Sequence, residues 1–276
     1  MIEIPEAITI AGQLNETVKG KVISRVETDD SRRICGYSFF EGDPDAYHDY
    51  LVGRAWGQAT APGRLIEVAI DDYRVVFGDG VNVRYLEAGS PPPKKCLMQI
   101  EFEDGSSLVC TVQMYGEMLV FKEGTNDNFY YLVNFEKPSP LSDEFTREYF
   151  QSIIDEAKPT LSAKGLIATD QRIPGIGNGA TQDILFKAGI HPKRKISTLD
   201  SAELDTLYST IKTSLADMVA GLGRDTEKTL FGDPGRYQTL LSAKTWKAPC
   251  PQCGEFIERK AFLGGNVYYC PTCQPL

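Results

Sequence analysis

The chain has 276 residues, of which 42% are hydrophobic and 24% are charged, a composition typical of a globular protein with one large or two modest domains. No run of about 18 apolar residues occurs and the first residues lack the basic-then-apolar pattern of a secretory signal, so we expect a cytoplasmic protein without a membrane span. The formal net charge of −9 argues against a uniformly basic nucleic-acid binder.

The charge is unevenly distributed. Residues 1–184 hold 17 Lys and Arg against 29 Asp and Glu, whereas residues 185–276 hold 12 against 9. The acidic excess is typical of solvated loops, or of a face that repels nucleic acid while another face does not.

The first half of the chain has the pattern of a β-rich domain. Short apolar or alternating runs are separated by turn residues, among them Asp71-Asp72 and Gly116-Glu117. The expected strands are 64–70, 73–77, 96–102, 107–115, 118–124 and 129–135. Many short strands at close spacing predict a sandwich or a barrel.

The pattern changes to helices after the segment KPSPLS at 137–142. Ser142 is a candidate N-cap for a helix whose apolar face includes Phe145 and Ile154. Further helices are expected over 161–168, from the end of the PGIGNG loop to Gly189, and from Ser197 or Thr198 to Gly221.

Four of the seven cysteines lie near the C-terminal end in two Cys-x-x-Cys pairs, Cys250 with Cys253 and Cys270 with Cys273. In a reducing compartment such pairs favour a metal over disulfides, and two tight turns offer the four thiolates of a tetrahedral zinc site. Four cysteines leave no open coordination position. We therefore predict a structural zinc ribbon, against the alternative of two unrelated turns with buried thiols.

The loop PGIGNG at 174–179 lies between two expected helices. Gly175, Gly177 and Gly179 let backbone amides approach a ligand, and the following helix N-terminus favours an anion such as phosphate. A tight interhelical turn without a ligand has the same pattern. A basic run follows, in which Lys193 is a candidate nucleic-acid contact, while we interpret His191 as a capping or packing residue.

Three segments resemble the formamidopyrimidine-DNA glycosylase and endonuclease VIII family: GIGNGATQDILFKAGIHP (175–192), FGDPGRY (231–237) and the two cysteine pairs. The first resembles that family's helix–two-turns–helix signature and the last its zinc finger, while MIEIPE resembles its Met-Pro-Glu-Leu-Pro-Glu opening. The resemblance implies an α+β, multi-domain fold. It would comprise an N-terminal β-sandwich (1–138), a helical helix–two-turns–helix domain (139–245) and a C-terminal β-hairpin zinc finger (246–276).

The resemblance also implies that nucleic acid lies in the cleft between the domains. Asn178 and the amides within 175–179 would hold one phosphate, and the zinc finger would hold another part of the backbone. Arg64, in Gly63-Arg64-Leu65, would take the place of a family lysine on a phosphate.

The start of this chain differs from the family at the residue that acts as the nucleophile. The family's enzymes use an N-terminal proline amine to attack C1′ of the damaged nucleotide, and an adjacent glutamate carries the proton. Here Ile2 occupies the proline position, whereas Glu3 keeps the position of the proton carrier. Isoleucine offers no secondary amine, and its size predicts that Met1 is retained.

Other family positions differ as well. Gly265 stands where the finger usually has an arginine, and Ala180 and Asp183 replace an aromatic and an acidic residue of the helix–two-turns–helix motif. Asp79 stands where the family often has a methionine that fills the gap left by a flipped base, and an acid there would repel DNA.

We therefore predict a DNA-glycosylase-family protein that binds damaged DNA or another structured nucleic acid, such as RNA, without the usual proline-dependent chemistry. Two alternatives stay open. One is an active glycosylase with an altered mechanism, in which Glu3 activates water or another amine replaces proline. The other is a protein–protein adaptor that reuses the fold. The expected cofactor is structural zinc, and we expect a monomer without a membrane partner.

Overall fold

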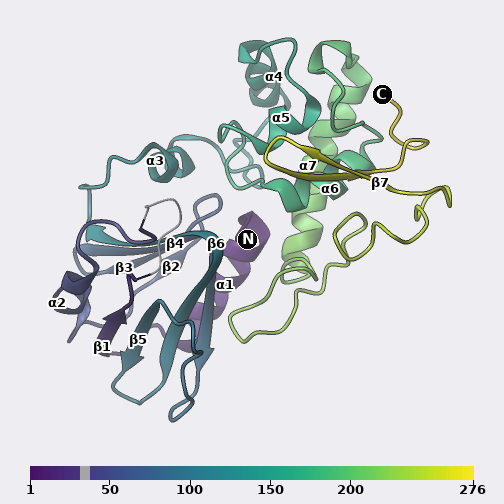
Figure 1. The fold of residues 1–276 in the computed structure, drawn as a ribbon. Coiled ribbons are helices and arrows are strands. Elements are labelled where there is room, and N and C mark those ends of the chain that lie inside the picture. The colour runs from purple at the N-terminus through teal and green to yellow at the C-terminus, as the bar shows by residue number, and fades with distance from the viewer. Residues whose placement is uncertain (32–37) are drawn as a thin grey trace.

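The computed structural model describes residues 1–31 and 38–276, apart from the side chain of Gln113. Figure 1 shows a β-rich N-terminal lobe and a helical lobe that carries the C-terminal hairpin, with helix α1 (Ile4–Thr17) where the two lobes meet. Within the described ranges, no helix has the length and apolar character needed to cross a membrane.

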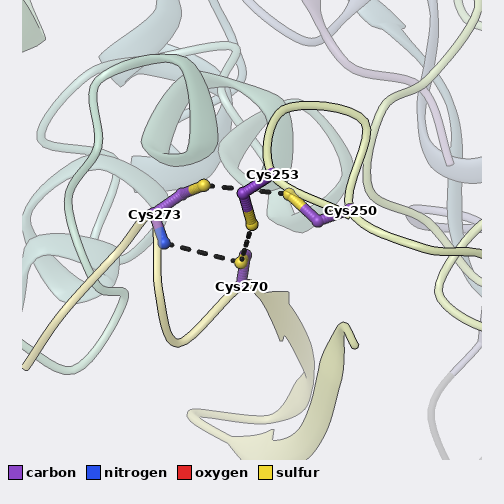
Figure 2. A group of neighbouring side chains, drawn as sticks. All are labelled: Cys250, Cys253, Cys270 and Cys273. Carbon is purple, nitrogen blue, oxygen red and sulfur yellow. Dashed lines mark hydrogen bonds between the residues drawn. The ribbon is translucent and has the colours of Figure 1, made fainter. Parts of the chain in front are cut away.

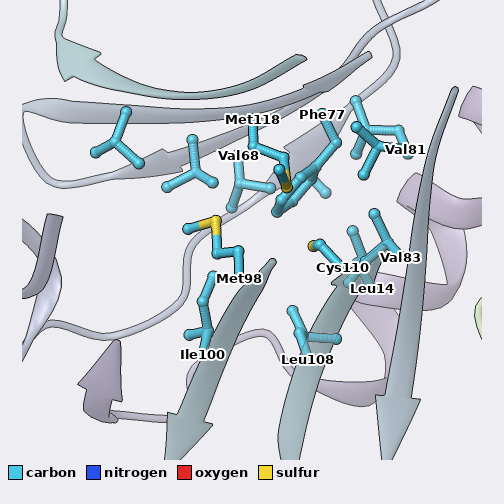
Figure 3. Packing of buried hydrophobic residues seen from close by; sticks show 14 of the residues in the cluster. Leu14, Val68, Phe77, Val81, Val83, Met98, Ile100, Leu108, Cys110 and Met118 are labelled. Carbon is cyan, nitrogen blue, oxygen red and sulfur yellow. The ribbon is translucent and has the colours of Figure 1, made fainter. Parts of the chain in front are cut away.

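A six-stranded antiparallel sheet builds the N-terminal lobe, in the order β1-β5-β6-β4-β3-β2. Its strands are β1 (Ile23–Thr28), β2 (Ala59–Thr60), β3 (Ile66–Ile70), β4 (Tyr73–Leu86), β5 (Met98–Phe102) and β6 (Ser107–Lys122). A register shift between Asp79 and Val81 divides the long β4–β6 ladder. Figure 3 shows side chains from both sides of the shift, such as Phe77 and Val83, facing one core, so the sheet folds over itself into the predicted sandwich.

Two strand predictions in this lobe were wrong. The expected strands 107–115 and 118–124 are one strand, because Gly116 pairs with Asp79 and continues the ladder instead of turning. The expected strand 129–135 is helix α3 (Phe129–Glu136). Asn128 caps this helix, since its side chain accepts a hydrogen bond from the Tyr130 amide at 2.8 Å.

Helix α1 and three short helical elements were not predicted. The short elements are the 3-10 helix η1 (Pro44–Ala46), the helix α2 (Tyr47–Leu51) and, later in the chain, the 3-10 helix η2 (Ile196–Thr198). Helix α1 begins with a capping box, in which the side chains of Glu3 and Glu6 each bond the other's backbone amide, and Pro5 lies in its first turn.

The helical lobe follows the sequence prediction with shifted starts. Its helices are α4 (Arg147–Glu156), α5 (Ala163–Ala168), α6 (Asn178–Lys187) and α7 (Ser201–Ala220). Thr146, not Ser142, caps α4 by accepting from the Tyr149 amide at 3.1 Å. Asp200 caps α7 in a capping box with Glu203, so this helix begins later than predicted.

The C-terminal hairpin consists of β7 (Glu258–Phe262) and β8 (Gly265–Tyr269). Leu263 and Gly264 join the strands with positive φ angles of 47° and 73°, which a two-residue type I′ turn requires. Phe186 of α6 packs with Tyr268 in a small apolar cluster, so the hairpin is held against the helical lobe.

Candidate nucleic-acid interface

Four thiol groups lie together beside the C-terminal hairpin, on the turns that precede β7 and follow β8 (Figure 2). Their sulfur atoms all lie within 4.8 Å of one another; the Sγ atoms of Cys253 and Cys270 are 3.4 Å apart and those of Cys250 and Cys273 are 3.8 Å apart. A tetrahedron with Zn–S bonds of about 2.3 Å separates its sulfurs by about 3.8 Å. The donor set therefore fits the predicted structural zinc, which these four cysteines would hold.

The carboxylate of Glu3 occupies the N-terminus of α6. It accepts hydrogen bonds from the amides of Gly177 (2.9 Å), Gly179 (2.8 Å) and Ala180 (2.9 Å), and from Nη1 of Arg224 (3.0 Å). A helix N-terminus favours an anion, and here the protein supplies its own. Two amides that the sequence suggested for a phosphate, those of Gly177 and Gly179, therefore donate to Glu3 instead.

The glycines of this loop are required by close packing within the protein. A Cβ atom on Gly177 would lie 2.7 Å from Cδ of Glu3, and one on Gly179 would lie 1.5 Å from Nη1 of Arg224. Gly175 has a φ of 92°, which favours glycine, and its carbonyl accepts from the Ile4 amide at 2.8 Å.

Arg224, in the segment that follows α7, joins this loop to α1. Its Nε and Nη2 atoms donate to the two carboxylate oxygens of Glu6 at 3.0 and 2.8 Å, and its side chain is 2% exposed. Burial alone would raise the pKa of Glu6, but the charge and hydrogen bonds of Arg224 hold that pKa below its usual value. No local pattern in the sequence marks this pair, because 218 positions separate its members.

The first two residues place their nitrogen atoms in different surroundings. The Ile2 amide donates to the carbonyl of Asp79 at 2.5 Å, and Ile2 is 4% exposed within the core of the N-terminal lobe. The Met1 amine lies 2.5 Å from Oε2 of Glu227. The backbone nitrogen of Ile2, at the position of the family's proline, is therefore hydrogen-bonded within a buried residue. The amine that lies in more exposed surroundings belongs to Met1.

Arg64, the predicted phosphate ligand of the N-terminal lobe, forms an ion pair with Asp79. Two distances, 2.9 Å from Nη1 to Oδ1 and 3.3 Å from Nη2 to Oδ2, define a bidentate contact between side chains that are 18% and 19% exposed. Beside them, burial and then the charge of Asp79 raise the pKa of Glu117. A phosphate on Arg64 would have to compete with this carboxylate.

Asn178 and Lys193 do not share a site. Asn178 lies at the start of α6, where its Nδ2 donates to the Asn266 carbonyl at 3.3 Å, and its buried Oδ1 has no hydrogen-bond partner within the described part of the chain. Lys193 places Nζ 5.3 Å from the ring centroid of Phe262 and lines a separate pocket with Thr198.

Two adjoining pockets meet at the first residue, and both are lined by Met1, Thr226 and Glu227. The larger has a volume of about 360 Å³ and also includes Asn82, Met114, Tyr115, Lys228 and Gly264. The smaller extends past Glu3 and Asn178 to Tyr268. The pockets are thus walled by the sandwich, the segment after α7 and the finger.

Met114 and Tyr115 are a feature that the sequence reasoning missed. The two residues are 60% and 57% exposed, although both have large, mainly apolar side chains. Exposed apolar side chains in a cleft mark a contact site, and such side chains can insert between nucleobases or stack on them. Sequence alone placed them in an ordinary alternating strand.

Two family models match the chain: the formamidopyrimidine-DNA glycosylase H2TH domain over residues 137–229, and the zinc finger found in FPG and IleRS over residues 248–276. The formamidopyrimidine-DNA glycosylase of Bacillus cereus is 28% identical over 100% of this chain and 99% of that protein. The corresponding protein of Bacillus subtilis is 26% identical over 99% of each.

Solved structures share the fold. The Lactococcus lactis Fpg in complex with DNA that contains an abasic site superposes with a TM-score of 0.84 at 21% identity, over 99% of this chain and 100% of that one. MutM (Fpg) from Thermus thermophilus has a TM-score of 0.80 at 23% identity, over 99% and 98% of the two chains. The sandwich, the helical lobe and the finger therefore occur together in proteins of known structure.

Proposed function

Because the chain is a member of the formamidopyrimidine-DNA glycosylase family, we propose that it binds damaged DNA in the cleft between its lobes, without the proline-dependent reaction. The observation that carries the proposal is the pair of pockets at Met1, which the sandwich, the helical lobe and the finger line together. The Lactococcus lactis relative of the same fold was crystallised with DNA containing an abasic site.

The surroundings of Ile2 support a loss of the usual nucleophile. Its nitrogen already donates to Asp79, and the residue is buried, so the atom that would attack C1′ in the family is neither free nor accessible. Activation of water by Glu3 is disfavoured as well, because its carboxylate accepts four hydrogen bonds from the start of α6 and from Arg224, besides the capping-box bond from the Glu6 amide, and its side chain is 3% exposed.

The groups that favour DNA lie on the pocket walls. Met114 and Tyr115 are placed to pack on bases, and Lys228 offers a cation to the phosphates beside the same pocket. Asn178 lines the smaller pocket at the start of α6, where the resemblance puts a phosphate ligand.

The distribution of charge favours selective binding over tight non-specific binding. Residues 1–138 hold 13 Lys and Arg against 22 Asp and Glu, whereas residues 139–276 hold 16 of each. An acidic sandwich repels the DNA backbone in general, so the bound form must be selected by shape at the cleft.

Fluorescence anisotropy tests the proposal, with labelled duplexes that differ only by one tetrahydrofuran abasic-site analogue. We expect the modified duplex to bind at least tenfold more tightly than the intact one, and its affinity to fall steeply with salt. Asn178→Ala should weaken binding without lowering the unfolding midpoint. Unchanged affinity in that variant would remove Asn178 from the interface, while a structured RNA that binds as tightly as the modified duplex would favour the RNA alternative. Absence of binding at every salt concentration would favour the adaptor.

A further inference from the structure

A separate pocket lies on the helical lobe, and none of the residues that line it also lines the two pockets at Met1. It has a volume of about 220 Å³ and is walled by α4, by the segment that follows α3 and by the loop between α5 and α6. Its lining residues are Lys137, Tyr149, Ser152, Ile153, Glu156, Ala157 and Arg172. The volume is smaller than the roughly 300–1,000 Å³ of sites for drug-sized ligands, so the pocket fits a small ligand.

Two cationic side chains from different segments meet in this pocket. Nζ of Lys137 donates to the Gln171 carbonyl at 2.8 Å, which holds the ammonium group against the loop. Nη1 of Arg172 donates to the carbonyls of Gly165 and Thr169, both at 3.2 Å, and the Arg172 side chain is 25% exposed. Burial and then the charge of Arg172 lower the pKa of Lys137, so the two cations repel each other. An anion bound between them would relieve that repulsion.

The carboxylates beside these cations limit which anions can bind. Asp170 accepts from Nη2 of Arg172 at 2.6 Å, but its side chain is 71% exposed, so solvent weakens this ion pair. Glu156, the last residue of α4, is the acidic residue that lines the pocket itself. It would repel an anion without a proton, such as sulfate. An anion that carries a hydroxyl group can instead donate to Glu156 while its other oxygens accept from the cations.

The wall formed by α4 adds a neutral donor. Burial and then the charge of Glu156 raise the pKa of Tyr149, so its hydroxyl group stays protonated at neutral pH and can donate a hydrogen bond. Oγ of Ser152 donates to the Tyr149 carbonyl at 2.8 Å, which leaves the hydroxyl oxygen as an acceptor. The pocket therefore combines several donors with an acceptor for one proton, which matches an anion with several bare oxygens and one hydroxyl group.

We propose that this pocket binds a phosphate group that still carries a proton, either the hydrogen phosphate ion or a protonated phosphate monoester. Lys137, Arg172 and Tyr149 would donate to the bare oxygens, and the phosphate hydroxyl would donate to Glu156. A phosphodiester of a nucleic-acid backbone has no such proton, so this pocket selects a different ligand from the cleft. The inference does not depend on the proposed function.

Isothermal titration calorimetry tests the inference with the whole chain at about pH 6, where about half of a phosphate monoester is protonated. The probes are the sodium salts of inorganic phosphate, methyl phosphate, dimethyl phosphate and sulfate. We expect inorganic phosphate to bind at least about tenfold more tightly than sulfate or dimethyl phosphate, because neither of these carries a proton for Glu156. Binding of methyl phosphate as well would support a monoester as the ligand, and binding of inorganic phosphate alone would support the free ion.

The variant Glu156→Gln tests the acceptor. Its carboxamide can donate to a bare oxygen, so sulfate should bind at least about tenfold more tightly than to the unmodified protein, and the preference for phosphate should be lost. Glu148→Gln removes the same charge at an exposed position of α4 outside the pocket, and this matched control should keep the preference. Lys137→Met should weaken phosphate binding at least about tenfold with an unchanged affinity for the tetrahydrofuran duplex.

Several results would overturn the inference. Sulfate or dimethyl phosphate that binds as tightly as inorganic phosphate would exclude selection by the proton, and an unchanged preference in Glu156→Gln would exclude Glu156 as the acceptor. No heat of binding and no broadening of the phosphorus-31 resonance at millimolar phosphate would exclude the site. Binding of the tetrahydrofuran duplex is measured separately, so each of these results leaves the proposed function standing.

Discussion

The substitution Arg224→Met gives the sharpest test of how the two lobes are joined. Arg224 donates three side-chain hydrogen bonds of 2.8–3.0 Å to Glu3 and Glu6, whose side chains are 3% and 4% exposed. A hydrogen bond to a charged group contributes at least about 1.5 kcal/mol, and breaking a buried ion pair costs about 3–5 kcal/mol. We expect the free energy of unfolding to fall by about 4 kcal/mol, a large share of the roughly 5–15 kcal/mol typical of a folded protein.

Urea unfolding followed by tryptophan fluorescence provides the assay. Trp56 is buried in the core of the N-terminal lobe and Trp246 packs beside the finger, so the two tryptophans report on different parts of the molecule. Arg147→Met is the matched control. Its partner Asp205 is 61% exposed, and removing that surface pair should cost less than about 1 kcal/mol.

The pH dependence gives an independent check on Arg224→Met. The pKa of Glu6 is held below its ordinary value of 4.5, so the stabilisation by Arg224 is fully present above pH 4.5 and is lost as the pH falls through the lower, folded-state pKa. The difference between the two proteins should therefore shrink in acid. A loss below about 1 kcal/mol at neutral pH, with an unchanged denaturant slope, would refute the reasoning.

Three other contacts each carry a prediction. Cys270→Ala should lose zinc and DNA affinity together; full zinc content by mass spectrometry with unchanged affinity would contradict the role of the finger. Asp79→Asn should release Arg64, tighten DNA binding and steepen its salt dependence, and adding Arg64→Gln should reverse the gain. Burial lowers the pKa of Lys164 to about 8, so between about pH 8 and 10.5 the unfolded chain binds more protons than the folded one. The stability of the unmodified protein relative to Lys164→Met should therefore rise across that window, and a constant difference in urea would contradict it.

The parts of the structure that sequence predicted best are those coded over a few positions. The cysteine spacing indicates a zinc site because each pair lies in one turn, and α5, α6 and α7 carry local stop signals or long apolar stripes. Helix α3 was taken for a strand because its run of aromatic residues has strand propensity, whereas the Asn128 cap and packing of Tyr131 on Phe121 decide the conformation.

The site was predicted less well because its decisive contacts are long-range. The glycines of the PGIGNG loop suggested an approaching ligand, and the close approach is real, but the approaching group is the carboxylate of Glu3, 174–177 positions away. No pattern in the sequence marked Glu227 as a residue of the site, because its partner is the nitrogen of Met1, 226 positions earlier. A local sequence pattern can show that a position requires close packing, but it does not identify the distant residue that packs there.

The first six residues have a consequence for the order of folding. Ile2 packs in the core of the sandwich and Ile4 in that of the helical lobe, while the partners of Glu3 and Glu6 include Arg224. During synthesis this segment leaves the ribosome well before Arg224, which lies more than 200 residues later in the chain. The sandwich must therefore form with the buried carboxylates of its leading helix still unpaired, and the closing of this long loop is expected to be a late step that sets the relative orientation of the lobes.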